Sequence, residues 1–255
     1  MKTSRCLCFF SLVLFATALH ADVTDTKEYD FVLREGGRIS LSNVNGDVHI
    51  EGVAGDKVHI TATRTADDQK YLDALEVVID ASDSEIRIET RHPDSSSGWF
   101  NWGNDSGGSV SYVLSVPGSA DLDTIETVNG DVLIAGMKGL VSTESVNGKL
   151  TATGLEGDVK LDTVNGSIDA EFNVLASGQR VSADAVNGRI VLRLPETASA
   201  RIHAETLNGS IDAEDFALEP DGGFIGHDLD GQIGAGEARV NIDTVNGSIA
   251  FKKRG

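Results

Sequence analysis

Residues 121–172 read DLDTIETVNGDVLIAGMKGLVSTESVNGKLTATGLEGDVKLDTVNGSIDAEF, and the triplet Val-Asn-Gly (VNG) occurs in this stretch three times, 18 residues apart. A second set of glycines lies midway between the triplets, so that a glycine recurs every nine residues from Gly130 to Gly166. Between the glycines, apolar and polar residues alternate, as in residues 159–163. Such alternation indicates strands with one buried face, and repetition at a fixed period indicates stacked equivalent units.

The Asn-Gly pair, preceded by Val or Leu, occurs seven times in the whole chain. After Gly166 its spacing loosens to 22, 21 and 38 residues. Asn and Gly suit tight turns, and asparagines stacked on neighbouring strands can hydrogen-bond in a column. We therefore expect a structural turn ladder made of Asn45, Asn129, Asn147, Asn165, Asn187, Asn208 and Asn246 with Gly46, Gly130, Gly148, Gly166, Gly188, Gly209 and Gly247.

These repeats predict an all-β protein, and two architectures can carry them. The first is a β-solenoid of about 18 residues per repeat with an N-terminal β cap, in which VNG corners stack in one column and plain glycine corners in another. The alternative is a set of hairpin-based β-sheets, because Asn-Gly is the preferred pair of a type I′ hairpin turn. Hairpins would use every turn alike, whereas here two kinds of turn alternate. The alternation favours the solenoid.

The first 21 residues have the composition of an export signal. Lys2 and Arg5 precede a short apolar stretch, Cys8 to Phe15, and small residues follow it. We expect residues 1–21 to be a cleaved signal peptide and the protein to be exported, to the periplasm or the cell surface. The apolar stretch is shorter than the roughly 20 residues that span a bilayer, so we expect no transmembrane segment after cleavage.

Cleavage would remove both cysteines, Cys6 and Cys8, and with them any disulfide chemistry. The loss of Lys2 and Arg5 leaves 19 Lys and Arg against 40 Asp and Glu, a net charge of −21. An acidic surface repels phosphate backbones, so we expect no nucleic-acid partner. The partner that we expect is an envelope protein, a glycan or a cationic peptide.

Residues 22–120 differ from the rest of the chain. They contain one clear repeat, around Asn45, and then ordinary alternating strands. A solenoid must cover its apolar end, so we expect residues 22–120 to form a β cap that is continuous, as one domain, with a VNG-repeat solenoid over residues 121–255.

A loop at residues 93–109, rich in Ser, Gly and Asp, interrupts the N-terminal region and holds Trp99, Phe100 and Trp102. Large aromatic side chains in a polar loop either pack onto the protein or recognise a partner. The sequence leaves both possibilities open. This aromatic cluster is the candidate binding loop.

Catalytic motifs are scarce in the chain, which contains no G-x-S-x-G, no H-E-x-x-H, no phosphate-binding loop and no G-x-G-x-x-G. Asp228 and Asp230 resemble a fragment of a calcium loop that lacks the other ligands. Four outward acids recur at what we expect to be equivalent repeat positions, namely Asp162, Asp169, Asp212 and Asp243. Glycoside cleavage needs two carboxylates about 5–10 Å apart in a cleft, and a repeated column singles out no pair. We expect no catalytic residue, no metal site and no cofactor.

The VNG repeats, the export signal, residues 39–52 (ISLSNVNGDVHIEG) and residues 111–117 (SYVLSVP) together resemble the bacterial "putative adhesin" domain family. The resemblance extends over most of residues 30–253. It implies an exported, non-enzymatic β-repeat protein without a defined active site. Some relatives are linked to cell-envelope stress responses, which implies a sensing role as an alternative.

We therefore expect a non-catalytic exported cell-envelope protein, an adhesin-like binding or scaffolding domain. One alternative is an envelope-stress component that binds cationic peptides or proteins through the acidic surface. A less favoured alternative is a carbohydrate-active enzyme built on a β-helix.

Overall fold

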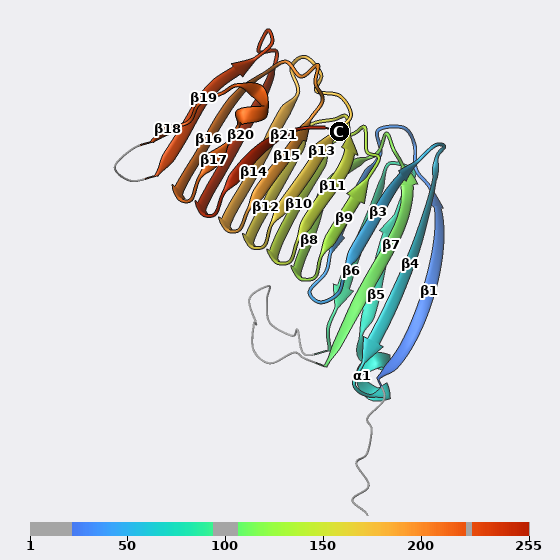
Figure 1. Cartoon of the computed structure of the whole chain (residues 1–255). Helices are drawn as coiled ribbons and strands as arrows, with labels where there is room; N and C mark the ends of the chain where they lie inside the picture. Colours follow the sequence, from blue (N-terminus) through green and yellow to red (C-terminus); the bar gives the residue numbers. More distant parts are fainter. Residues whose placement is uncertain (1–21, 94–106, 223–225, 255) are drawn as a thin grey trace, which may run out of the picture.

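The chain forms two long β-sheets, seen as the stacked strands of Figure 1, in a computed structural model that describes residues 22–93, 107–222 and 226–254. Sheet A has ten strands, in the spatial order β1 (Val23–Val32), β4 (Lys57–Ala66), β7 (Gly108–Pro117), β3 (Val48–Val53), β9 (Val132–Ala135), β11 (Leu150–Leu155), β13 (Ile168–Phe172), β15 (Ile190–Leu194), β21 (Ile249–Lys253) and β17 (Ile211–Asp212). Sheet B has eleven, in the order β18 (Asp221–Gly222), β19 (His227–Ile233), β16 (Ala200–Asn208), β20 (Ala238–Asn246), β14 (Arg180–Asn187), β12 (Val159–Asn165), β10 (Val141–Asn147), β8 (Asp121–Asn129), β2 (Arg38–Ser42), β6 (Glu85–Arg91) and β5 (Glu76–Ala81).

The fold is therefore all-β, with long parallel sheets of a β-solenoid-like kind. Each inner strand sends alternate side chains into the space between the sheets, as period-2 geometry requires. On β12, Val159, Leu161 and Thr163 are buried, while Lys160 points outward. The buried side chains of both sheets join in one hydrophobic core, whose largest members include Tyr112, Phe172 and Phe251. Each repeat adds its buried side chains to this core along the stack.

A VNG corner joins a strand of sheet B to a strand of sheet A, so the two flanking strands do not pair with each other. At Asn129, for example, β8 continues into β9 in the other sheet. A type I′ turn needs positive φ at both central residues. Among the described residues, Ala217 is the one non-glycine residue with positive φ. The hairpin alternative is therefore wrong at these corners.

Glycine is needed at the corners because successive corners stack closely. A Cβ atom added to Gly166 would lie 1.9 Å from the carbonyl oxygen of Gly148, and one added to Gly188 would lie 1.7 Å from that of Gly166. No side chain tolerates such a contact with backbone. The recurring glycine is a packing requirement of the column.

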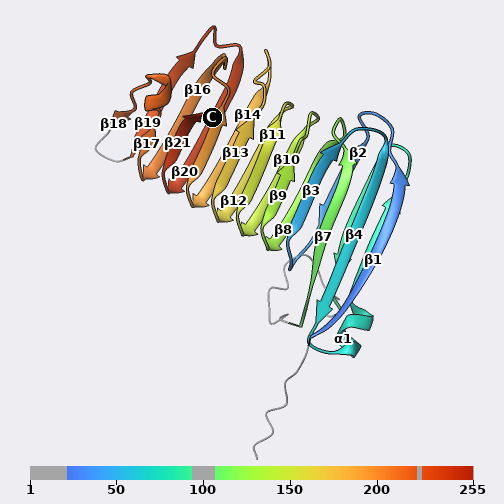
Figure 2. The ribbon, with the colours of Figure 1, turned by 45° about the vertical axis from the view of Figure 1, so that its right-hand side comes forward.

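The strand pairs do not stack in chain order at either end of the molecule. The last pair, β20 and β21, lies between the pair β14 and β15 and the pair β16 and β17. Figure 2 shows β20 between β14 and β16 in this way. At the other end β2 and β3 lie between the pair β6 and β7 and the pair β8 and β9. The first and last VNG repeats are thus internal to the stack.

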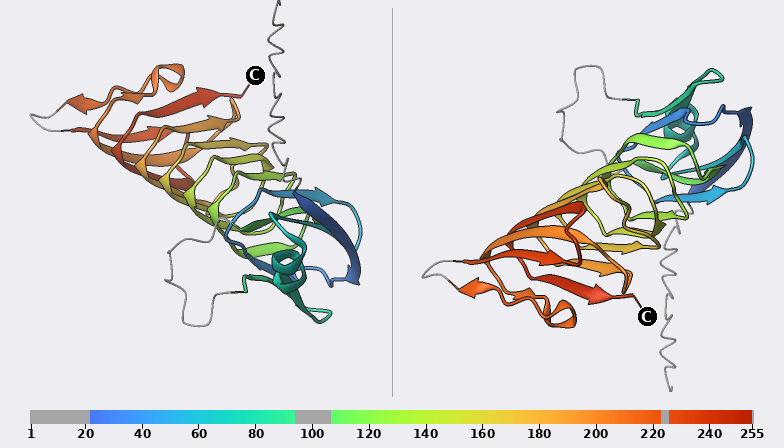
Figure 3. Two further views of the ribbon diagram at one scale, coloured as in Figure 1. Left: turned by 90° about the horizontal axis from the view of Figure 1, so that it is seen from below. Right: turned by 90° about the horizontal axis from the view of Figure 1, so that it is seen from above.

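Antiparallel strands close both ends, where parallel stacking stops (Figure 3). At one end β1 pairs with β4 and β5 with β6, and at the other β19 pairs with β16. The two short helices lie near these ends: α1 (Gln69–Ala74) follows β4, and the 3-10 turn η1 (Glu214–Phe216) follows β17. No helix within the described residues is long and apolar enough to cross a membrane. The expected signal peptide at residues 1–21 lies outside the described residues.

Candidate functional site

The outward face of sheet B is organised in columns that run across the strands. Six of its strands, β8, β10, β12, β14, β20 and β16, pair in parallel with their Asn residues in register. Equivalent repeat positions therefore lie side by side, about 4.8 Å apart, as strand spacing dictates. Each outward position of the repeat becomes one column of side chains.

One of these columns is acidic on all six strands. Its members face outward three residues before the corner asparagine, and in spatial order they are Glu126, Glu144, Asp162, Asp184, Asp243 and Glu205. Asp228 of β19 extends the column by lying opposite Glu205. We call this set of seven carboxyl groups the acidic column.

The acidic column places like charges side by side, and the pKa values of three of its members are raised. Burial and the neighbouring carboxylates of Asp162 and Asp243 raise the pKa of Asp184. Burial and Glu205 raise the pKa of Asp243, and burial and Glu144 raise that of Glu126. Proton binding relieves both the repulsion and the desolvation of the charge. The column therefore favours any event that neutralises it.

Few cations balance the acidic column. Lys160 Nζ lies 2.6 Å from Asp162 Oδ2 and 3.3 Å from Glu144 Oε1. His203 Nε2 lies 3.3 Å from Glu205 Oε1. In the described part of the chain, no Lys or Arg forms an ion pair with the other members, which are Glu126, Asp184, Asp243 and Asp228.

An apolar column runs beside the acidic one, two residues further along each strand. It consists of the residues that precede the corner asparagines: Val128, Val146, Val164, Val186, Val245 and Leu207. Val164, Val186, Val245 and Leu207 are 40%, 41%, 41% and 51% exposed. We call this set the apolar column.

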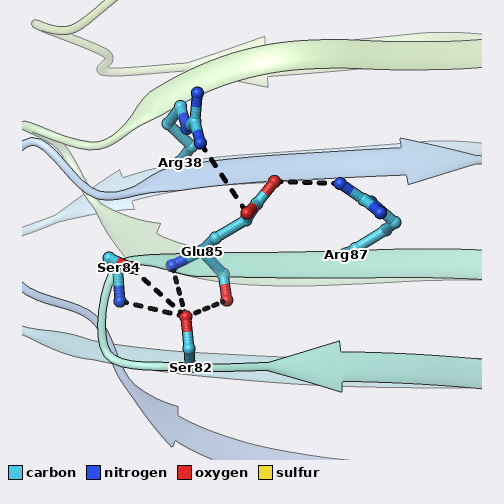
Figure 4. A network of polar contacts seen from close by, with 5 residues as sticks. All are labelled: Arg38, Ser82, Ser84, Glu85 and Arg87. Carbon is cyan, nitrogen blue, oxygen red and sulfur yellow. Dashed lines mark hydrogen bonds and ion pairs between the residues drawn. The ribbon is translucent and has the colours of Figure 1, made fainter.

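The two columns line one long groove of about 2010 Å³ on the outward face of sheet B. Residues 226–228 lie at one end of the groove, and Arg87, Arg91 and His92 of the β6 region lie at the other. At that second end the carboxylates are paired. Glu85 contacts Arg38 at 3.7 Å and Arg87 at 3.1 Å, as Figure 4 shows.

The corner asparagines border the groove, and their side chains are hydrogen-bonded to one another. In each step Nδ2 of one asparagine donates to Oδ1 of the asparagine before it in the column, at 2.8–3.0 Å. In spatial order the column consists of Asn45, Asn129, Asn147, Asn165, Asn187, Asn246 and Asn208. These amides bond to one another along the edge of the groove, and the acidic and apolar columns form most of its floor.

Sheet A carries a different outward face on its C-terminal strands. Arg193 pairs with Asp169 there, Arg254 Nε lies 2.9 Å from Glu171 Oε1, and Lys252 Nζ lies 2.7 Å from Asp212 Oδ2. The hydrogen bond from Lys252 lowers the pKa of Asp212. On this face acids and bases neutralise each other.

The structure separates the four acids that the sequence suggested were equivalent. Asp162 and Asp243 lie in sheet B, whereas Asp169 and Asp212 lie in sheet A. The expectation of one column containing all four is wrong, because the chain changes sheet at each VNG corner. Asp230, half of the calcium-like fragment, bonds to His203 Nδ1 at 2.7 Å. The described residues contain no group of three His, Cys, Asp or Glu that could hold a metal ion.

Sequence reasoning missed most of the acidic column, although a signal was present. An acid occurs three residues before the asparagine in six of the seven repeats, the exception being Ser42 before Asn45. The candidate binding loop with Trp99, Phe100 and Trp102 lies outside the described residues.

Comparison with known proteins identifies one family. The model of the family described as Toastrack DUF4097 matches residues 33–252. Among solved structures, the chain is similar to a putative cell adhesion protein from Clostridium sporogenes ATCC 15579, with 16% identity, a TM-score of 0.52, and coverage of 90% of this chain and 100% of that one. It is also similar to a putative adhesin from Bacteroides fragilis NCTC 9343, with 14% identity, a TM-score of 0.36, and coverage of 89% and 97%. No curated protein matches the sequence.

Proposed function

Because the chain belongs to the Toastrack DUF4097 family, we propose that it is a non-catalytic, exported cell-envelope protein that binds a partner in the groove of sheet B. The observation that carries this proposal is the contrast between the two outward faces. The C-terminal strands of sheet A pair Asp169, Glu171 and Asp212 with Lys or Arg. Sheet B leaves Glu126, Asp184 and Asp243 without a Lys or Arg ion pair among the described residues. A row of exposed apolar side chains is typical of an interaction site, and a row of like charges attracts oppositely charged ligands.

The fold serves as a scaffold in this proposal. Repeats of about 18 residues, each contributing a strand to both sheets, form a solenoid in residues 121–255, and residues 22–120 cap it. Such a stack multiplies one outward residue pattern into a long binding surface, since each repeat contacts its neighbours in the same way. The surface belongs to the rigid sheet rather than to loops.

Export is part of the same proposal. The composition of residues 1–21 supports a signal peptide that directs the protein to the periplasm or the cell surface. The description of the Clostridium sporogenes protein as a putative cell adhesion protein is in keeping with an envelope role. An envelope-stress role is the second candidate, and the acidic column favours it, because a cationic partner would neutralise the column. The repetition of similar acids along six strands gives less support to a glycan-cleaving enzyme, which needs one distinct pair.

A crosslinking experiment with two matched positions tests the proposal. Val164 in the groove and Leu133 on sheet A are 40% and 39% exposed, so a photo-crosslinking amino acid can replace either with similar access. We expect envelope partners to be captured in cells from position 164 and not from position 133. Equal capture from both positions, or capture from position 133 alone, would contradict the assignment of the binding face. Fractionation of the same cells tests export, and a cytoplasmic protein would contradict that part.

A further inference from the structure

We propose that the occupant of the sheet B groove is a cationic amphipathic α-helix that lies along the stack axis, with a basic stripe on the acidic column and an apolar stripe on the apolar column. This inference rests on the proposed function, because it names the partner class of the same face. Its first support is charge complementarity: seven carboxyl groups line up there, with Lys160 and His203 as their only basic partners among the described residues.

The second support is the floor of the groove. The strands beneath it, β8 to β16 in spatial order, are hydrogen-bonded to a neighbour on both sides. They have no free edge to which an extended peptide could add as a further strand, the mode that uses main-chain hydrogen bonds. An occupant gains no main-chain hydrogen bonds from these strands, and an α-helix satisfies its own backbone N–H and C=O groups internally.

The third support is the spacing of the acidic column. Its members on parallel strands repeat about every 4.8 Å. A basic stripe on an α-helix repeats about every 5.4 Å, which long Lys and Arg side chains can match over four to five turns. Alternate side chains of an extended strand repeat about every 6.7 Å, and those of a polyproline II helix about every 9.3 Å. The helix is the closest of the three to the register of the acids.

The extent of the groove sets the length of the helix. From Glu126 to Glu205 there are six strands, which correspond to about 24 Å along the stack and to a helix of about 16 residues. Acidic and apolar columns lie two residues apart on each strand, about 6.7 Å. The helix therefore needs its basic and apolar stripes next to each other rather than on opposite sides.

Three further arginines on these strands lie too far from the acidic column to form ion pairs with it. Arg180, Arg201 and Arg239 face outward near the opposite ends of β14, β16 and β20, and Arg180 pairs with Asp158. They lie four residues from the acids on the same strands, about 13 Å away, and do not line the groove.

Synthetic peptides test the inference directly. The probe is an amidated, fluorescently labelled 16-residue peptide whose Lys and Leu residues form adjacent stripes when helical. One control has the same composition in scrambled order, and another has two central D-residues that break the helix. Binding to the mature chain is measured by fluorescence anisotropy, and helix formation by circular dichroism. We expect the striped peptide to bind at least tenfold more tightly than either control and to gain helicity on binding.

Two matched protein variants locate the binding face. Glu126→Gln, Asp184→Asn and Asp243→Asn remove three of the seven carboxylates of the groove, whereas Asp169→Asn, Glu171→Gln and Asp212→Asn remove three carboxylates from sheet A. We expect the first set to weaken binding of the striped peptide at least tenfold and the second to change it less than threefold. Val164→Ser with Val186→Ser should weaken binding without changing its salt dependence. Circular dichroism and thermal unfolding verify that each variant is folded.

The outcomes separate this inference from the proposed function. If the striped, scrambled and helix-broken peptides bind equally well, the helix is wrong although the groove still binds cations. If no peptide binds, or if the sheet A set weakens binding as much as the groove set, the inference is overturned. Capture of envelope partners at position 164 in cells would still support the proposed function in either case.

Discussion

The outward faces of sheets A and B are built from the same repeats, yet their charges are arranged differently. On sheet A, Asp169, Glu171 and Asp212 each lie beside a Lys or Arg. On sheet B, a carboxyl group recurs on six adjacent strands with Lys160 and His203 as the basic side chains in contact. Because equivalent repeat positions stack in register, a residue type that recurs at one position forms a continuous row across the sheet. A face becomes neutral only where the repeats differ from one another, as those of sheet A do.

We expect the largest loss of stability from a substitution at a corner, because each corner joins a strand of sheet B to a strand of sheet A. Gly188 joins β14 of sheet B to β15 of sheet A, and a Cβ atom there would lie 1.7 Å from the carbonyl oxygen of Gly166. We expect Gly188→Ala to destabilise the fold by about 3 kcal/mol or more, because backbone stacking must give way. Urea unfolding followed by circular dichroism measures the loss.

Gly222→Ala is the matched control for that substitution. A Cβ atom at Gly222 would meet the His227 ring at 3.6 Å, an ordinary contact. We expect its effect to stay within about 0.5 kcal/mol. Similar losses for the two substitutions would contradict the role of corner stacking.

Substitutions in the asparagine column, which lies at the boundary between the two faces, should cause the next largest loss of stability. Asn165 donates to Asn147 at 3.0 Å and accepts from Asn187 at 2.9 Å, whereas Asn208 donates to Asn246 at the end of the column. We expect Asn165→Ala to destabilise the fold by about 1–2 kcal/mol and Asn208→Ala by roughly half as much. Thermal unfolding of both variants checks the ratio, and an equal or reversed ratio would show that the column does not act as a connected chain.

Stability should depend on pH with opposite signs on the two faces. Burial and like charges raise the pKa of Asp184 and Asp243, so their contribution to stability is lost as pH rises through those pKa values. Lys252 lowers the pKa of Asp212, so its contribution is present at neutral pH and is lost as pH falls through that lowered value.

The corresponding substitutions should move stability in opposite directions. At pH 7, Asp184→Asn with Asp243→Asn should be more stable than the parent protein, and Asp212→Asn less stable. The first difference should shrink as the pH is lowered towards 4, because the raised pKa values of Asp184 and Asp243 are then approached, whereas the second should shrink only below the ordinary Asp pKa of 3.8, towards the lowered pKa of Asp212. Urea unfolding at several pH values measures them, and differences of the same sign on the two sheets would refute the contrast.

The smallest effect on stability is expected at Lys160. It is the lysine that contacts both Glu144 and Asp162, and its side chain is half exposed. We expect Lys160→Met to change stability by less than about 1 kcal/mol, because exposed ion pairs contribute little. The same substitution should strengthen binding of a cationic peptide in the groove, since it leaves two more carboxylates unpaired. Weaker peptide binding by this variant, measured by anisotropy, would argue against the acidic column as the contact surface.

Much of the architecture can be predicted from particular residues. The alternation in residues 159–163 predicts a half-buried strand, and the regular glycines predict recurring corners, because a strand has a period of two and a crowded corner admits no side chain. The acid that occurs three residues before the corner asparagine in six of the seven repeats was equally visible in the sequence. The acidic column itself could not be predicted, because the local sequence does not show that six such acids lie on adjacent strands of one sheet.

What the sequence alone determined is the unit: a strand, a corner asparagine with its glycine, and a strand, repeated around one core. The tertiary structure decided where each unit stands. It placed Asn246 between Asn187 and Asn208, out of chain order, and it put Asp162 and Asp169 on opposite faces although they are seven residues apart. Local propensities set the pattern within a repeat, whereas the pairing between repeats depends on which neighbours best satisfy long-range hydrogen bonds and burial. The groove results from this pairing between repeats.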